Sequence, residues 1–266
     1  MINKPAIGVA AVVLAVAAGT WWYLQTRHAA VTHEPAPAQE PEAPAPAGEA
    51  AIQHPLPPAA PDAASSTPLP ALADSDLPIE EALSAVAGAA AVKDYLLPAN
   101  IIRHLVVTID NLPRQKVAVD KRPTGPVAGS FAADGDELHA TLDPQNFARY
   151  QPMVAVVSRL DMAKLASVYV RFYPLFQRSY QDLGYPNGYF NDRLVQVIDS
   201  LLATPQPAGP IDLVRPNVMF LFADPALESR PAGQKLLIRM GPENAAAIKA
   251  KLTELRAAIA AVPPKR

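Results

Sequence analysis

The stretch from Asp161 to Leu202 constrains the fold most, because its pattern predicts two amphipathic helices joined by a short turn. In its first half, apolar side chains recur every three, four or seven positions, which places them on one helical face. Asp161 precedes them as an N-cap, since its carboxylate can accept amide hydrogens of the first turn. Pro174 lies inside the pattern and predicts a kink or a break near Arg171.

A turn rich in Gly, Pro and Asn follows, and a second helix is expected to begin near Tyr189. Gly184 and Pro186 end the first helix, and an apolar stripe runs along the second until Thr204. Two amphipathic helices with so short a link should pack as an antiparallel hairpin. Because burial of each large apolar side chain contributes roughly 1.5–3 kcal/mol, this pair could anchor a domain core.

The rest of residues 71–266 shows mostly helical patterns interrupted by short strand-like segments. Strands are expected on both sides of the turn at Asp134-Gly135-Asp136 and on both sides of Arg215-Pro216-Asn217. The fold class is therefore mainly α, or α+β with minor short strands. Further helices are predicted from Asp76 to Gly88, Pro98 to Asn111, Asp143 to Leu160 and Lys235 to Met240, and from Gly241 onward.

The segment from Ala6 to Leu24 carries no charge and is long enough to span a bilayer, which takes ~20 residues. Lys4 precedes it and places the N-terminus in the cytoplasm by the positive-inside tendency. Trp21-Trp22-Tyr23 lies at the far end, where interfacial aromatic side chains are typical. A cleaved signal peptide, with Ala17-Ala18-Gly19 near the cut, is the rival interpretation. We favour an uncleaved transmembrane anchor over residues 1–27.

Residues 28–70 consist mainly of Ala, Pro, Glu and Gln, and they contain much of the chain's total of 30 prolines. Such a segment has too little apolar surface to offset the entropy of ordering, so it is expected to be a disordered linker with polyproline character. A passive spacer is favoured over a proline-rich ligand for a partner. The linker would hold the domain of residues 71–266 away from the membrane.

Charge and cysteine content exclude several classes of function. The formal net charge is −2 and the domain is nearly neutral, whereas a nucleic-acid binder needs a basic face. The chain has no cysteine, so neither disulfides nor a thiolate nucleophile can form. A basic loop from Arg114 to Arg122 could touch anionic envelope polymers or lipid head groups, although four dispersed charges favour a solvated loop.

Motifs for catalysis and cofactor binding are missing from the sequence. There is no GxSxG elbow and no Walker or Rossmann glycine pattern. The domain contains only His104 and His139, too few for a zinc site, so we expect no metal and no cofactor. Paired carboxylates could support a glycosidase-type enzyme, but helix caps and salt bridges explain them equally well. The available carboxylates are Asp182, Asp192, Asp199, Asp212 and Glu243.

The turn between the two central helices is the best candidate for a binding surface, because Tyr and Arg dominate binding hot spots. The residues that we expect to form this surface are Tyr185, Tyr189, Asn191, Asp192 and Arg193, together with Arg239. A structural turn is nevertheless favoured over a binding surface, because turn chemistry alone accounts for the Gly, Pro and Asn residues here. In that interpretation Asn191 or Asp192 caps the helix, and Arg193 bonds a carboxylate or a carbonyl at a helix C-terminus.

Four segments resemble a bacterial family of membrane-anchored proteins catalogued as domain of unknown function number 3014. They are residues 110–114, 189–194, 198–205 and 233–244. The resemblance extends from about Leu72 to the C-terminus, behind a similar anchor and Pro/Ala-rich tether. It implies a bacterial inner-membrane anchor with an outward-facing domain, and it brings no activity, substrate or catalytic residue.

These observations predict a single-pass protein of the inner membrane whose periplasmic helical domain binds a protein or cell-wall partner. The alternative is a carboxylate-dependent enzyme acting on envelope glycan or peptide. A third hypothesis is a stability or assembly factor for an envelope machine.

Overall fold

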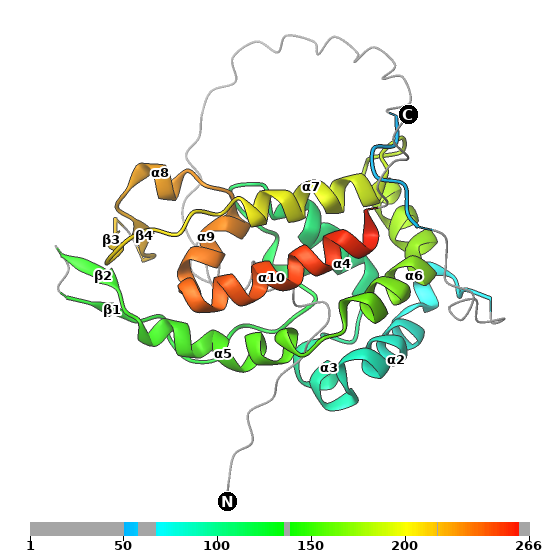
Figure 1. Ribbon diagram of the computed structural model, residues 1–266, viewed down its shortest axis with the longest axis horizontal. Coiled ribbons are helices and arrows are strands. Elements are labelled where there is room, and N and C mark those ends of the chain that lie inside the picture. The colour runs from blue at the N-terminus through cyan, green and yellow to red at the C-terminus, as the bar shows by residue number, and fades with distance from the viewer. Residues whose placement is uncertain (1–50, 58–67, 136–138, 217, 261–266) are drawn as a thin grey trace, which may run out of the picture.

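The computed structural model describes residues 51–57, 68–135, 139–216 and 218–260 (Figure 1). The predicted anchor, Ala6 to Leu24, lies outside these residues, as does most of the predicted linker. Within the part of the chain that is described, no helix combines the length and the apolar character that crossing a membrane requires.

The described domain is mainly helical, as the sequence predicts, and its last helix lies at the centre (Figure 1). Helix α10 packs against α5, α6 and α7, while α4 packs against α6 and α7 on another side. Apolar stripes of these helices form the main core. The helices are α2 (Asp76–Ala87), α3 (Ala89–Tyr95), α4 (Ile101–Asn111), α5 (Gln145–Ser158), α6 (Met162–Asp182), α7 (Phe190–Leu202), α8 (Pro225–Glu228), α9 (Ala232–Arg239) and α10 (Pro242–Ile259).

The two central helices form where the sequence predicts them. Asp161 caps α6, because its Oδ1 accepts the amide hydrogens of Ala163 at 3.0 Å and Lys164 at 3.1 Å. Of the kink or break predicted near Arg171, the break is wrong, since α6 continues from Met162 to Asp182 through Pro174. Buried aromatic side chains on both sides of Pro174 hold the two halves of the helix against the same core.

The start of the domain differs in two ways from the prediction. Helix α3 was not predicted, and it begins directly after Gly88, whose φ of 88° ends α2. Asp76 is the first residue of α2, as predicted, but its side chain does not cap that helix. Instead its carboxylate accepts the amide hydrogens of Asn100 at 2.7 Å and Ile101 at 2.8 Å, so it caps α4. A contact across this distance in sequence cannot be inferred from local pattern.

A small antiparallel sheet lies at one end of the domain, on the left in Figure 1. Its order is β1 (Ala133–Asp134), β2 (Ala140–Leu142), β3 (Asp212–Val214) and β4 (Leu221–Phe222), so the strands predicted on both sides of the two turns are confirmed. Ile238 of α9 joins the apolar face of this sheet. The sheet therefore fixes the end of α9 beside the loop that joins β3 to β4.

Helix α9 is buried along its whole length. Its first amides bond the chain just after α4, from Ala232 to the carbonyl oxygen of Arg114 at 2.8 Å and from Gly233 to that of Leu112 at 3.0 Å. A Cβ at Gly233 would lie 2.7 Å from Cδ2 of Leu201, so any other residue here would force the Leu201 side chain to move. These contacts place Arg239, at the last turn of α9, inside the domain.

Candidate functional site

The turn predicted as a binding surface is tied to the domain by a buried carboxylate. Asp110 lies at the end of α4, and its side chain is 2% exposed. Arg193 donates from Nε to Asp110 Oδ1 at 3.0 Å and from Nη2 to the Asp110 carbonyl oxygen at 2.7 Å. Arg114 bonds Asp110 Oδ2 at 2.5 Å, and this carboxylate raises the pKa of Arg114. The expectation that Arg193 bonds a carboxylate or a terminal carbonyl in a structural turn is confirmed, and it does both.

The other face of the turn binds residues 51–57, a segment inside the predicted linker that we name the strap. Asp192 accepts the amide hydrogens of Gln53 at 3.0 Å and His54 at 2.6 Å. The hydroxyl of Tyr189 accepts the amide hydrogen of Leu56 at 3.3 Å. Leu56 also packs against the main core. The structure thus seats this part of the linker segment on the domain.

Asn191 connects the strap with the core. Its side chain is fully buried and donates from Nδ2 to the carbonyl oxygens of His54 at 2.8 Å and Ile259 at 3.1 Å. The expected cap by Asn191 or Asp192 is wrong, because Oε1 of Gln177 accepts the first amide hydrogen of α7, from Phe190, at 2.8 Å. The side chain of Gln177 in α6 therefore caps α7, a role that the local sequence assigns to a residue of the turn.

Tyr185 also faces inward. Its ring stacks on Tyr180 at 4.5 Å between centroids, and its hydroxyl lies 3.0 Å from Nη2 of Arg114. Five of the six predicted site residues thus lie together, and they form hydrogen bonds with other segments of the same chain. Arg239 lies apart from them, at the sheet end of the domain.

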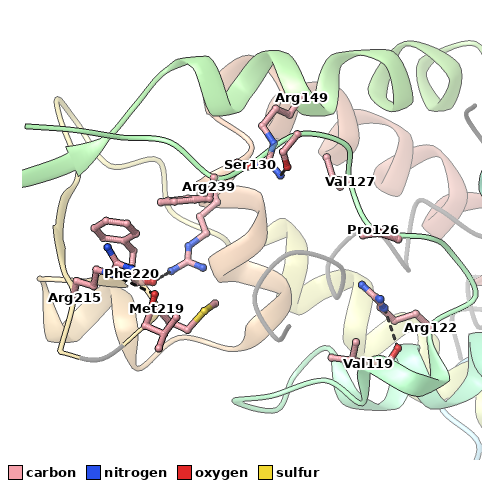
Figure 2. A pocket seen from close by; sticks show the side chains of 13 residues that line it. Val119, Arg122, Pro126, Val127, Ser130, Arg149, Arg215, Met219, Phe220 and Arg239 are labelled. Atoms are coloured by element: carbon pink, nitrogen blue, oxygen red, sulfur yellow. Dashed lines mark hydrogen bonds between the residues drawn. The ribbon is translucent and has the colours of Figure 1, made fainter. Parts of the chain in front are cut away.

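Arg239 lines a cavity of about 790 Å³ that we name the arginine pocket. The loop between β3 and β4, α5, α9 and the segment from Val119 to Phe131 form its walls, and Figure 2 shows the side chains. The described lining residues include four arginines and no carboxylate. They are Val119, Arg122, Pro126, Val127, Gly129, Ser130, Phe131, Arg149, Arg215, Val218, Met219, Phe220 and Arg239.

Arg239 is the most buried of the four arginines, with 6% of its surface exposed. Its Nη2 donates to the carbonyl oxygen of Phe220 at 2.9 Å, and its guanidinium lies 4.8 Å from the ring centroid of Phe222. Its Nε has no hydrogen-bond partner among the described residues. Burial lowers the pKa of Arg239, while the charge of Glu228 acts in the opposite direction. Glu228 itself pairs with Lys235 at 2.7 Å.

The other three arginines are positioned by backbone carbonyls. Arg149 donates to the carbonyl oxygens of Ala128 at 3.0 Å and Gly129 at 2.9 Å. Arg215 is exposed, lies 5.3 Å from the ring centroid of Phe220, and donates to the Val218 carbonyl at 3.3 Å.

Arg122 donates to the Val119 carbonyl at 2.9 Å, and burial lowers its pKa. In Figure 2 its guanidinium and that of Arg239 enter the pocket from opposite sides.

This arrangement suits an anion. Planar guanidinium groups bind carboxylate and phosphate oxygens through paired hydrogen bonds. Ligand pockets of 300–1,000 Å³ with apolar walls and a few polar groups are typical of small-molecule sites. The pocket has this size and also exposes the apolar side chains of Val127, Met219 and Phe220.

The carboxylates considered for catalysis are dispersed over the described domain. Asp182 pairs with Arg178 at 3.1 Å and with Arg103 at 3.6 Å, and Asp192 holds the strap. Asp199 pairs with Arg256, while Asp212 and Glu243 are exposed. No group of three or more His, Asp or Glu side chains that could hold a metal occurs in the described ranges.

Of the two histidines in residues 71–266, His104 lines a separate cavity of about 290 Å³, beside α4 and the end of α6. Burial and the charge of Lys121 lower its pKa, and its Nδ1 is buried without a hydrogen-bond partner among the described residues. His139 is exposed. The histidines therefore lie apart from the arginine pocket.

Comparison with known proteins identifies a family but no individual related protein. No curated protein and no solved structure matches this chain. One family model, described as "Protein of unknown function (DUF3014)", matches residues 101–256. This match runs from the start of α4 to residue 256 within α10, and it includes the sheet, Asp110 and all four arginines of the pocket. The chain therefore belongs to the DUF3014 family.

Proposed function

We propose that this protein is a non-catalytic, membrane-tethered binding protein of the cell envelope. The segment from Ala6 to Leu24 holds it in the inner membrane, and the domain recognises a protein or cell-wall partner in the periplasm through the arginine pocket. The observation that carries the proposal is the convergence of four arginines on one cavity without a carboxylate among the described lining residues.

The electrostatics of the domain support a specific site over general attraction of anions. The chain as a whole has a formal net charge of −2, so the arginines are a local concentration on a nearly neutral protein. Clefts lined by one sign of charge raise the local concentration of oppositely charged ligands. An anionic group on a partner would therefore be drawn to this pocket.

The position of the strap also supports the proposal. The strap lies near the turn between α6 and α7, and the sheet with α9 lies at the other end of the domain (Figure 1). A chain arriving from the membrane through the strap would reach the domain at the end away from the pocket. The pocket would then be accessible to a partner in the envelope.

The enzyme alternative has less support. The arginine pocket has no carboxylate among its described lining residues, and the candidate carboxylates are engaged elsewhere or exposed. General acid–base catalysis by two carboxylates requires both groups in one cleft. The arginine pocket offers cations instead.

Site-specific photo-crosslinking in whole cells tests the proposal. A crosslinking amino acid replaces Val218, which is exposed at the pocket, and in a control it replaces Leu77, exposed on α2. We expect a discrete envelope adduct from position 218 only. An equal yield from both positions, or no adduct from 218, would contradict it.

Fractionation of the same cells tests the tether. The full chain is expected in the inner-membrane fraction after carbonate washing, with its domain cleaved by protease only once the outer membrane is opened. Recovery of the intact chain in the cytosol would overturn this part of the proposal.

A further inference from the structure

We propose that the ligand of the arginine pocket is a phosphate ester whose other end is apolar. The inference rests on the proposed function, because it names the chemical class that the same site would take. Its support comes from the unbalanced charge of Arg239, from the number of guanidinium groups and from the apolar walls.

The first step is the state of Arg239. Helix α9 buries three long polar side chains, and two of them are fully engaged with the chain itself. Gln234 donates to the Ser200 carbonyl at 2.6 Å and accepts from Arg230, while Lys235 bonds both the carboxylate and the carbonyl of Glu228. Arg239 has one hydrogen bond to a neutral carbonyl and aromatic faces around it.

A buried charge without a carboxylate partner is costly, because desolvation is not repaid by a Coulombic attraction. Among the described residues, Arg239 forms no ion pair, and its Nε is a buried donor without an acceptor. Unsatisfied buried donors are rare in folded proteins and call for an explanation such as a missing ion. An anion in the pocket would supply both the counter-charge and, after a small shift of the side chain, the acceptor.

The second step is the number of guanidinium groups. A carboxylate carries one negative charge on two oxygens, and one arginine satisfies it. A phosphate monoester carries about −1.5 to −2 at pH 7 and offers three strong acceptor oxygens. Arg122, Arg149, Arg215 and Arg239 reach the cavity from four different segments, which suits an anion that accepts from several directions.

The third step is the apolar surface beside the cations. Val119, Pro126 and Val127 lie on one side of the pocket and Met219 and Phe220 on the other, as Figure 2 shows. Inorganic phosphate would leave these side chains in water. A phosphate ester with an alkyl or isoprenoid chain would cover them, so the pocket fits an amphiphilic phosphate such as a soluble ester or a lipid headgroup with part of its chain.

Calorimetry on the full chain in a non-ionic detergent tests the inference. The probes are hexyl phosphate, inorganic phosphate, hexanoate and hexanol. We expect hexyl phosphate to bind at least about tenfold more tightly than each of the others, since a pocket distinguishes the loss of a charged group or of several methylenes by at least this factor. Hexanoate binding as tightly as hexyl phosphate, or no binding of hexyl phosphate, would overturn the inference.

Variants locate the binding. Arg215→Gln is the main test, because Arg215 is exposed and we expect its loss to leave the fold intact. We expect it to weaken hexyl phosphate binding by about tenfold, the effect of losing a charge-assisted hydrogen bond.

The Arg239→Lys variant keeps the buried charge but loses the planar guanidinium that can donate two parallel hydrogen bonds. It should therefore weaken hexyl phosphate binding as well. Arg159→Gln, an exposed arginine at the end of α5, is the control and should leave affinity unchanged. Equal loss in the control and Arg215→Gln would overturn the assignment.

Vesicles distinguish the source of the phosphate. Full chain reconstituted in phosphatidylcholine nanodiscs is mixed with phosphatidylcholine vesicles that contain or lack phosphatidic acid. If the chain floats with the vesicles only when they contain phosphatidic acid, and hexyl phosphate reverses this, the ligand is a lipid headgroup. If the chain binds hexyl phosphate but does not float with the vesicles, the ligand is a soluble ester. Both outcomes agree with the inference. Flotation that Arg215→Gln leaves unchanged would contradict it.

The two proposals can fail separately. An adduct at position 218 without hexyl phosphate binding would reject the phosphate ester and keep the tethered binding protein. Phosphate ester binding without any envelope adduct would reject the proposed partner binding and keep the ligand class.

Discussion

At the scale of single residues, Asp110 and its two arginines connect α4 with the turn before α7. The carboxylate is almost fully buried, Arg193 is one-fifth exposed, and Arg114 lies largely in solvent. The sequence predicted the bonding chemistry of Arg193 but not its partner, since Asp110 lies 83 positions away in the chain. Residue type indicates what a side chain can bond, and only the fold decides which partner it meets.

Arg193→Met is expected to lower the free energy of unfolding by about 3 kcal/mol, because it removes one partner of a buried ion pair and leaves the other charge undercompensated. Chemical denaturation of the variant and the native chain measures the difference. The control is Asp199→Asn, which breaks the exposed pair with Arg256 and should cost less than about 1 kcal/mol. Equal losses in the two variants would contradict the buried role of Asp110.

His104 predicts a dependence of stability on pH. Burial and Lys121 lower its folded-state pKa below the unfolded value of 6.5, so the unfolded chain binds the proton more readily. The His104 contribution to stability is therefore fully present above pH 6.5 and is lost as the pH falls toward the folded pKa. In His104→Gln, the denaturation midpoint should fall less than in the native chain between pH 7.5 and 5.5. His139→Gln, at an exposed position, should follow the native chain. If the denaturation midpoint falls equally with pH in the native chain and in both variants, His104 does not contribute to the pH dependence of stability.

At the scale of elements, the strap shows how a linker segment becomes part of the fold. Composition alone predicts disorder for residues 28–70, and the strap has no apolar periodicity that would suggest otherwise. The strap is held on the domain by hydrogen bonds from its backbone amides to the side chains of Asp192 and Tyr189. Bonds to the backbone leave no signal in the side-chain pattern, so this contact could not be predicted.

Most helices were predictable because their apolar stripes repeat over many residues, as in α6, α7 and α10. The two errors in the predicted helices, at α3 and at Pro174, have local causes. Helix α3 is short and rich in alanine, so it has little apolar stripe to recognise. Pro174 satisfies the usual rule for a helix break, yet buried side chains of α6 on both sides of it override that rule.

Asp192→Ala is expected to release the strap without unfolding the domain. Its carboxylate accepts from two amides, and hydrogen bonds to charged groups contribute about 1.5–3 kcal/mol. Hydrogen exchange at Gln53 and His54 should accelerate at least about tenfold, while exchange in α10 stays unchanged. Asp212→Ala, at an exposed carboxylate, is the matched control. Unchanged exchange at both strap amides in Asp192→Ala would contradict the seating of the strap.

At the scale of the whole molecule, the arginine pocket exists because the fold brings four distant segments together. The sequence favours a solvated loop for the basic segment containing Arg122, over a contact with anionic polymers, and Arg239 is among the candidate residues. Arg149 and Arg215 carry no signal in the sequence, since each is an isolated cation within an ordinary helix or loop. Their convergence depends on the sheet, which sets the loop between β3 and β4 beside α9.

A methyl NMR titration of the full chain with hexyl phosphate tests the central claim most directly. Met219 lines the arginine pocket, whereas Met162 lies in the main core and reports on unspecific changes. The account predicts a saturable shift of the Met219 methyl resonance and no shift of Met162. In Arg215→Gln, the Met219 shift should saturate only at about tenfold higher hexyl phosphate concentration. Saturable binding that leaves Met219 unmoved, or that shifts both methyl groups alike in the native chain and in Arg215→Gln, would contradict it.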